Sequence, residues 1–398
     1  MTSYLGTISM GVKAPIIRKG DDLTKLTVDC IVNASEAHNI PIDNMDVVAL
    51  TESIVARAEG NYVSVNDVTR SVQEVVGTDA QIAVVHPIMS RNRFAMCLKG
   101  IARAAQKVLV VFKYPSDEVG NKLISDEDFE KIAGNDASQI MSEQNFRDAF
   151  GYKVHEFTGV DYVDYYKKII ESENCEAEVI FCNSVEALSM LEEYDFICCD
   201  IHTREATKKI LREYSSAVYG LDDLCTTPGV DEGGYNAQYG LLGSNKANEE
   251  CLKLFPRDGQ KLVEAIQQEF LERTGKRVEV MVYGDGAFKD PVGKIWELAD
   301  PVVSPAHTDG LLGTPNELKL KALADGKYAE LKGEELKKAI EEEIRQKNGS
   351  LVGNMNSQGT TPRRITDLLG SLADLTSGSG DKGTPIVWVK GYFKNYAD

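Results

Sequence analysis

Aspartates in glycine-rich surroundings are the residues of this sequence best suited to chemistry. Asp231 lies in the segment Thr226-Thr-Pro-Gly-Val-Asp-Glu-Gly-Gly234, and Asp285 lies in Val280-Met-Val-Tyr-Gly-Asp-Gly-Ala-Phe288. Carboxylates beside small residues can hold Mg²⁺ or Mn²⁺, because these hard cations take oxygen ligands and leave positions for nucleotide phosphates. Asp-Gly is also ordinary turn chemistry, which is the more frequent explanation for either motif taken alone.

A third glycine-rich loop, Ser377-Gly-Ser-Gly-Asp-Lys-Gly383, can wrap a phosphate or base through its backbone N–H groups, or simply connect two elements. Lys13, Arg18 and Arg57 are candidate sources of positive charge for a triphosphate. The sequence has no GxxxxGK[ST], GxSxG or HExxH motif and no GxGxxG placed between a strand and a helix, and its five histidines are far apart. Each histidine is therefore more readily explained by a structural role.

The elements around these residues follow an α/β pattern. A strand over 277–283 ends just before Asp285, and α/β sheets bind their ligands at the carboxyl ends of strands. A strand over 46–51 runs into a helix over 52–59, and residues 72–85 are rich in β-forming residues. Further helices are predicted at 259–274, as a charged, solvated pair over 316–348, and at 362–375, followed by a strand over 385–390.

The middle of the chain differs from the rest. Residues 114–224 alternate strands and helices, with strands predicted at 178–182 and 195–200 and helices at 161–172, 184–193 and 203–214, which is typical of a small parallel sheet. This segment holds 25 acidic and 10 basic residues, whereas the remaining 287 residues hold 37 and 34. We therefore predict a discontinuous core (1–113 and 225–398) and an inserted acidic α/β domain (114–224).

Composition limits the class of protein. The 398 residues carry a formal net charge of −18, with 42% hydrophobic and 27% charged residues, so global disorder is excluded. The negative charge argues against nucleic acid or an anionic membrane as partner. No run approaches the ~20 apolar residues of a membrane span, and no secretory signal is evident. Eight cysteines without a CxxC pair are expected to be free thiols in a cytoplasmic protein.

Taken in order, several segments resemble the coenzyme F-420-0:L-glutamate ligase (gamma-glutamyl ligase) family. They are Gly11–Leu23, a Gly/Pro turn leading to GDDL; Asp46–Gly60, a strand followed by a segment similar to KIVSKAEG; Thr227–Gly233, similar to NAGVDES; Leu254–Asp258, similar to LLPxDP; Val280–Asp285, similar to a strand ending in DTFGRP; and the tail Asp367–Leu375 with Gly383–Gly391. Residues 114–224 have no counterpart in that family core.

The resemblance implies an α+β mixed-sheet ligase core and a specific reaction. A nucleoside triphosphate, GTP or ATP, phosphorylates a substrate carboxylate, and the amine of glutamate then attacks the acyl phosphate. Two divalent ions, Mg²⁺ or Mn²⁺, would neutralise the phosphates and hold the in-line geometry. The family also implies a homodimer whose partners are small molecules: nucleotide, glutamate and a carboxylate acceptor.

Site residues carry over where the motifs match. The resemblance assigns metal binding to Asp231, Asp285 and Gly286, and we take the two aspartates also as the catalytic residues. It assigns nucleotide binding to Lys13, Ala14, Pro15, Ile16, Arg57, Gly234, Ser379 and Asp381.

The chain also departs from the family pattern. The first lysine of KIV is Ser53, and the Arg-Pro after the second metal aspartate is replaced by Lys289-Asp290. A family asparagine falls on Gly234, with Asn236 nearby, and an acidic position falls on Ser379, with Asp381 nearby. These changes put the nucleotide and the acceptor in question.

We therefore expect a ligase that joins glutamate, or a similar amino acid, to a cofactor-like or folate-like carboxylate. A metal-dependent phosphotransferase or hydrolase, or a non-catalytic nucleotide-binding homologue, remains an alternative.

Overall fold

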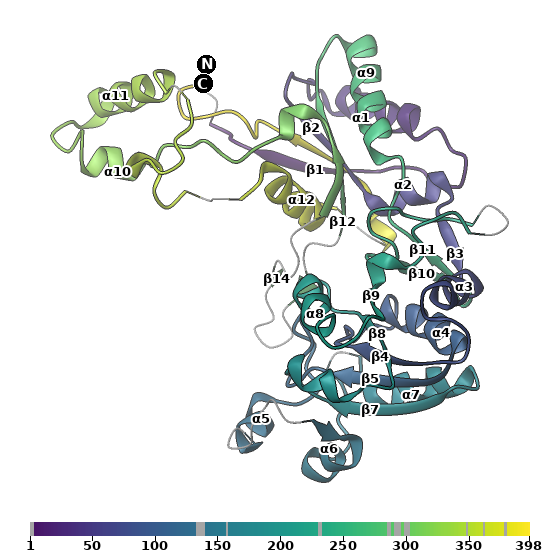
Figure 1. The fold of residues 1–398 in the computed structure, drawn as a ribbon. Helices are drawn as coiled ribbons and strands as arrows, with labels where there is room; N and C mark the ends of the chain where they lie inside the picture. Colours follow the sequence, from purple (N-terminus) through teal and green to yellow (C-terminus); the bar gives the residue numbers. More distant parts are fainter. Residues whose placement is uncertain are drawn as a thin grey trace.

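The computed structural model describes residues 4–132, 140–156, 158–229, 233–284, 288–289, 296–297, 303–347, 349–360, 363–377 and 380–398. The chain forms two lobes, each built on its own sheet, and an arm of two helices that extends away from both (Figure 1). This is the mixed α/β architecture that the sequence predicts. Asp231, Asp285, Gly286 and Ser379 lie outside the described residues.

The first lobe contains a five-stranded mixed sheet in the order β1-β16-β2-β12-β15. Of its neighbouring strand pairs, only β2 and β12 are parallel to each other. Val47 lies beside Glu279, and Thr51 lies beside Tyr283. The elements of this lobe and the arm are β1 (Ile8–Val12), α1 (Leu23–His38), β2 (Val47–Thr51), α2 (Glu52–Glu59), β3 (Tyr62–Ser64), β10 (Asn245–Asn248), β11 (Cys251–Lys253), α9 (Gly259–Thr274), β12 (Glu279–Gly284), β13 (Phe288–Lys289), β14 (Trp296–Glu297), β15 (Val303–His307), α10 (Leu320–Asp325), α11 (Gly333–Arg345), α12 (Ile365–Thr376) and β16 (Ile386–Lys390).

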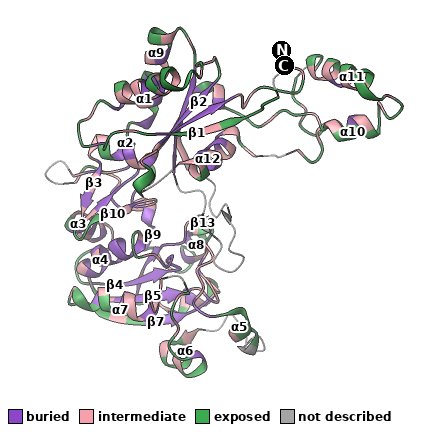
Figure 2. Cartoon of the chain, turned by 180° about the vertical axis from the view of Figure 1, so that it is seen from behind, coloured by how far each residue is buried: buried purple, intermediate pink, exposed green. Residues whose placement is uncertain are grey.

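Both faces of this sheet are covered by helices. Val28 of α1 and Phe270 of α9 pack with Leu50 of β2 on one face, and Leu369 of α12 packs with Ala49 of β2 on the other. Figure 2 shows β2 buried between these layers, whereas the edge strand β1 is exposed or half-buried along most of its length. Because both faces are buried, β2 and β12 contain continuous apolar runs, Val47–Leu50 and Val280–Val282, instead of an alternating pattern.

The second lobe contains a six-stranded sheet in the order β6-β7-β5-β4-β8-β9, in which all strands but β6 are parallel. Its elements are α3 (Val65–Val76), β4 (Ala80–Val85), α4 (Phe94–Ala104), β5 (Ala105–Phe112), α5 (Asp126–Ile132), β6 (Met141–Ser142), α6 (Glu143–Phe150), α7 (Tyr162–Ser172), β7 (Glu176–Phe181), the 3₁₀ helix η1 (Glu186–Met190), β8 (Asp195–Cys198), α8 (Arg204–Leu211), β9 (Val218–Gly220) and the 3₁₀ helix η2 (Leu221–Asp223).

The order in which the chain visits the parallel strands makes the sheet of this lobe doubly wound. From β4 the chain moves to β5 and β7 on one side, then returns to β8 and β9 on the other. Tyr166 of α7 packs on the face that carries Val110, and Leu211 of α8 packs on the face that carries Val111. The direction of winding therefore reverses between β4 and β8.

The structure corrects two sequence-based expectations. The stretch 72–85 is not continuous β-structure, because residues 65–76 form α3 and only Ala80–Val85 form a strand. Val65, Val68 and Val72 recur at helical spacing and are all buried, and Ser64 with Asp67 forms a capping box at the start of the helix. The helix expected at 184–193 is the short 3₁₀ segment η1.

The parallel sheet extends across the expected boundary at residue 114. Strands β7 and β8 lie in the predicted insertion, yet β7 pairs with β5 and β8 pairs with β4, both of which precede it. The division of the chain into domains remains a prediction, but the sheet itself starts at β4.

Other features agree with the sequence. All eight cysteines are free thiols. In the described part of the chain, no helix has the length and apolar character needed to cross a bilayer. Ile340 is the one buried residue of helix α11, and its other residues are half-buried or exposed.

Candidate active site

The carboxyl ends of β2 and β12 meet at one edge of the first sheet. Thr51 of β2 lies beside Tyr283 of β12, and Gly284 follows as the last residue of β12. Asp285, which comes next in the chain, is outside the described residues. The strand that precedes it ends at Gly284, one residue beyond the predicted end, at the edge where α/β sheets bind ligands.

A buried ion pair lies beside Gly284. The Nζ of Lys253 is 2.6 Å from Oε2 of Glu52, and each side chain is only 8% exposed. A β-carbon added to Gly284 would overlap the side chain of Glu52. The pair therefore requires glycine at this position, and it places a carboxylate at the end of β2. The sequence alone does not reveal this pair, because its partners are 201 positions apart and no local pattern links them.

Phe255 connects this edge to the segment that follows Asp231. A β-carbon at Gly284 would lie 3.0 Å from the ring of Phe255. The carbonyl oxygen of Phe255 accepts hydrogen bonds from Asn61 Nδ2 at 2.6 Å and Asn236 Nδ2 at 3.3 Å. The segment that follows Asp231 is therefore held next to Gly284, the residue that precedes Asp285.

Gly234 is held against β3. Its N–H donates to the carbonyl oxygen of Tyr62 at 2.7 Å, and a β-carbon there would come within 2.5 Å of Asn61 Oδ1. Asn61 also exchanges hydrogen bonds with Tyr235, donating from Nδ2 to the carbonyl oxygen and accepting from the N–H, both at 3.0 Å. Asp231 lies outside the described residues, but Gly234 and Tyr235, which follow it in the chain, are fixed by these contacts.

Asn236, which lies near the family asparagine position, has a structural role. Its Nδ2 donates to the carbonyl oxygens of Phe255 and Pro256, and its Oδ1 accepts from the N–H groups of Gln238 and Tyr239. The side chain is 4% exposed. All its hydrogen-bonding capacity is used inside the fold, so Asn236 is not available as a nucleotide ligand.

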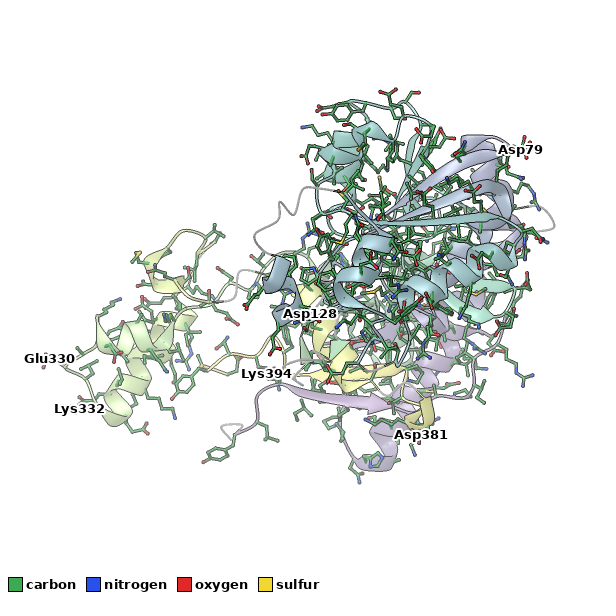
Figure 3. The ribbon with its side chains drawn as sticks, turned by 90° about the horizontal axis from the view of Figure 1, so that it is seen from below. Asp79, Asp128, Glu330, Lys332, Asp381 and Lys394 are labelled. Atoms are coloured by element: carbon green, nitrogen blue, oxygen red, sulfur yellow. The ribbon has the colours of Figure 1, made fainter. Side chains whose placement is uncertain are left out.

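The structure brings the early Gly/Pro turn and the late glycine-rich loop together. The N–H of Ala14 donates to the carbonyl oxygen of Gly383 at 3.1 Å, and the N–H of Thr51 donates to the carbonyl oxygen of Pro385 at 3.1 Å. Lys13, Pro15 and Asp381 are solvent-exposed, as is Ile16, at 81%. Figure 3 shows Asp381 at the surface of the first lobe. Ser379 lies outside the described residues.

The same turn contacts the end of α2. Arg57 Nε donates to the carbonyl oxygen of Ile17 at 3.1 Å, and the N–H of Gly20 donates to the carbonyl oxygen of Ala58 at 2.8 Å. Gly60, at φ +65°, ends the helix in the left-handed conformation. Three segments far apart in the sequence, around residues 14, 57 and 383, thus form one surface next to the carboxyl end of β2.

Glu59, the last residue of α2, is a carboxylate close to this surface. Its carboxylate accepts from the N–H groups of Arg257 and Asp258, at 2.7 and 3.0 Å, directly before α9 begins. Burial raises the pKa of Glu59, although these hydrogen bonds oppose the shift. Within the described ranges, no group of three or more His, Cys, Asp and Glu side chains is arranged to hold a metal ion.

Comparison with curated proteins finds no match to this chain. The sequence profile of F420-0:Gamma-glutamyl ligase matches residues 11–391, which is nearly the whole chain. The match runs through both lobes and includes the early turn, the ends of β2 and β12, and the late loop. The chain therefore belongs to the F420-0:gamma-glutamyl ligase family, whose activity in general terms is that of a glutamate ligase.

Proposed function

We propose that this protein uses a nucleoside triphosphate and a divalent metal ion to join glutamate, or a similar amino acid, to a carboxylate of a cofactor-like or folate-like acceptor. The observation that carries the proposal is the convergence at Phe255. The end of β12, which leads to Asp285, and the segment after Asp231 both pack against this residue. The described residues next to Asp231 and Asp285, which are 54 positions apart in the sequence, therefore lie in the same region of the fold.

In this proposal Asp231, Asp285 and Gly286 hold Mg²⁺ or Mn²⁺. The glycines that flank them suit such a site, because Gly234 and Gly284 pack where a β-carbon would collide with neighbouring atoms. When bound, the metal neutralises phosphate charge during transfer of the γ-phosphoryl group. The donor set is oxygen-rich, as these cations require.

The nucleotide, GTP or ATP, would bind along the surface formed by the early turn, α2 and the late loop. Lys13 and Arg57 supply positive charge, and Ala14, Pro15, Ile16, Gly234, Ser379 and Asp381 complete the expected contacts. The hydrogen bonds of Ala14 to Gly383 and of Arg57 to Ile17 support this arrangement, since they hold the three segments at fixed positions. Positioning of this kind supplies much of the rate in phosphoryl transfer.

Phosphate release tests the proposal. The protein is incubated with Mg²⁺ or Mn²⁺, each nucleotide, and a panel of carboxylate acceptors with and without glutamate. Release that depends on both glutamate and acceptor supports the ligase. Release without glutamate would instead identify a phosphotransferase or hydrolase, and tight nucleotide binding without turnover would identify a binding protein.

Two substitutions test the metal assignment. Asp231→Asn and Asp285→Asn should abolish metal-dependent nucleotide turnover and leave folding intact, whereas Asp325→Asn, an exposed carboxylate on α10, should behave as the unmodified protein. Normal turnover in both site variants would overturn the assignment. The family also leads us to propose a homodimer, which sedimentation velocity measures directly.

A further inference from the structure

A cavity lies at the point where the winding of the second sheet reverses. It has a volume of about 240 Å³. Cys199 follows the end of β8, Leu221 follows the end of β9, and Ile88 lies three residues beyond the end of β4, and all three line it. This is the edge at which doubly wound sheets bind their ligands. The proposed ligase chemistry makes no use of it.

The ordinary ligand of such an edge, a dinucleotide, does not fit here. Its phosphates bind to the free N–H groups at the start of the helix that follows the strand. In this protein the carboxylate of Glu118 accepts hydrogen bonds from the N–H groups of Ile201, His202 and Thr203, at 2.6, 2.7 and 2.9 Å, immediately before α8. An internal anion therefore occupies the phosphate position.

The walls of the cavity are apolar and aromatic. Phe94 of α4, Tyr239 and Phe255 line it, and the rings of Tyr239 and Phe255 lie 5.3 Å apart at an interplanar angle of 62°. Cys97 and Cys199 are also lining residues, and burial raises the pKa of Cys97 to about 11 and that of Cys199 well above its ordinary value. Both thiols are neutral at pH 7, so these walls favour a planar aromatic ring.

The charged side chains that line the cavity are both positive. Arg93 and Arg204 line the cavity, and no carboxylate belongs to its described lining. Arg204 is fixed at the wall, because its Nε lies 2.8 Å from Asp222 Oδ1 and its Nη1 donates to the carbonyl oxygen of Ile201 at 2.9 Å. A ligand that places a ring against Phe94 and Phe255 would meet guanidinium groups at its edge. An acidic group on that ring is the complement of such a lining.

We propose that this cavity binds a small planar aromatic carboxylate. The site goes beyond the ligase reaction and is recognised by its own chemistry: aromatic walls for the ring and arginine for the acid. Phe255 is shared between the two regions, since its ring lines the cavity and also approaches Gly284 at the end of β12. Only the ring of Phe255 would therefore separate the bound ligand from the end of β12 in the candidate active site.

Isothermal titration calorimetry with 2-naphthoate tests the site directly, without nucleotide, metal or turnover. We expect one equivalent to bind with a Kd of about 1 mM or tighter. The neutral analogue 2-naphthamide should bind about tenfold more weakly, because it lacks the charge that arginine recognises. Absence of saturable 2-naphthoate binding, or equal affinity for the two probes, would overturn the proposal.

Substitutions locate the binding. Leu242→Trp adds bulk at a half-buried lining position and should weaken 2-naphthoate binding at least about tenfold. The same change at Leu271, which is 43% exposed on α9, is the matched control and should leave binding unchanged. Arg93→Gln should weaken 2-naphthoate binding and reduce the difference in affinity between 2-naphthoate and 2-naphthamide, because of the two arginines only Arg204 then remains at the wall. Unaltered binding in Leu242→Trp would place the probe elsewhere and reject the site, whatever the outcome of the phosphate-release assay.

Discussion

Lys253 and Glu52 form an ion pair that is buried at the carboxyl end of β2, with Nζ and Oε2 2.6 Å apart. Lys253 belongs to β11, and Glu52 begins α2, so the pair joins the small β3-β10-β11 sheet to the five-stranded sheet. Both charges are removed from water, and each depends on the other to compensate for that loss.

Removing one partner should therefore cost far more than removing both. Lys253→Met leaves the Glu52 carboxylate buried without its cation, and we expect a loss of about 3–5 kcal/mol in the free energy of unfolding. The double variant Glu52→Leu with Lys253→Met should recover a large part of it. Urea denaturation of the two single variants and the double variant measures the coupling. Additive losses would show that the two side chains act independently.

Gly234 and Gly229 provide a matched pair beside Asp231. In Gly234→Ala the new methyl group would meet the backbone N and O of Tyr62, at 2.6 and 2.8 Å, which cannot move aside easily. We expect a loss of about 1–3 kcal/mol and reduced metal-dependent turnover. In Gly229→Ala the nearest atom is 3.2 Å away on the side chain of Asp67, so the loss should be smaller. Thermal unfolding ranks the two, and the reverse order would contradict the described packing.

Arg57 tests the proposed nucleotide surface. Its Nε holds the carbonyl oxygen of Ile17, and its charge faces the same exposed turn. Arg57→Gln should raise the Kd for nucleotide about tenfold, because one charge-assisted contact is lost. Arg345→Gln, at the exposed end of α11, removes the same charge far from this surface and serves as the control. Fluorescence titration with a labelled nucleotide compares them, and similar affinities would argue against the surface.

His86 should make stability depend on pH. The residue is 4% exposed at φ +52°, and burial lowers its pKa below the ordinary 6.5. Below about pH 6.5 the unfolded chain binds a proton that the folded chain does not, so stability falls as pH falls, by at most about 1.4 kcal/mol per pH unit. His86→Asn keeps a residue that tolerates positive φ and removes the titration. Urea midpoints between pH 5 and 8 should show a weaker pH dependence in the variant.

Local patterns were sufficient for most elements. The helix predicted at 259–274 has those bounds in the structure, and Gly275 ends it at φ +66°. The strand predicted to precede Asp285 ends at Gly284. Residues 72–85 were misread because valines suit strands, whereas the buried valines of α3 repeat at helical spacing from Val65 onward.

The contacts that assemble the candidate site could not be predicted in the same way. The hydrogen bond between Ala14 and Gly383, and the packing of Phe255 against Gly284, join segments that no periodicity relates. The cavity beside Phe94 likewise depends on strand order, which the boundary expected at residue 114 obscured. Only the resemblance to a family pointed to the early turn and the late loop together.

The exchange of hydrogen bonds between Asn61 and Tyr235 closes a loop across 174 positions of the chain, and the whole parallel sheet lies inside that loop. Closing a flexible loop of this length costs about 5 kcal/mol in chain entropy before any contact is gained. A folded second lobe removes most of this cost, because it already holds its entry and exit together: the N–H of Cys225 donates to Ser71 Oγ at 2.8 Å. The folded second lobe thereby keeps Asn61 and Tyr235 close together, and its unfolding would release the segment that follows Asp231.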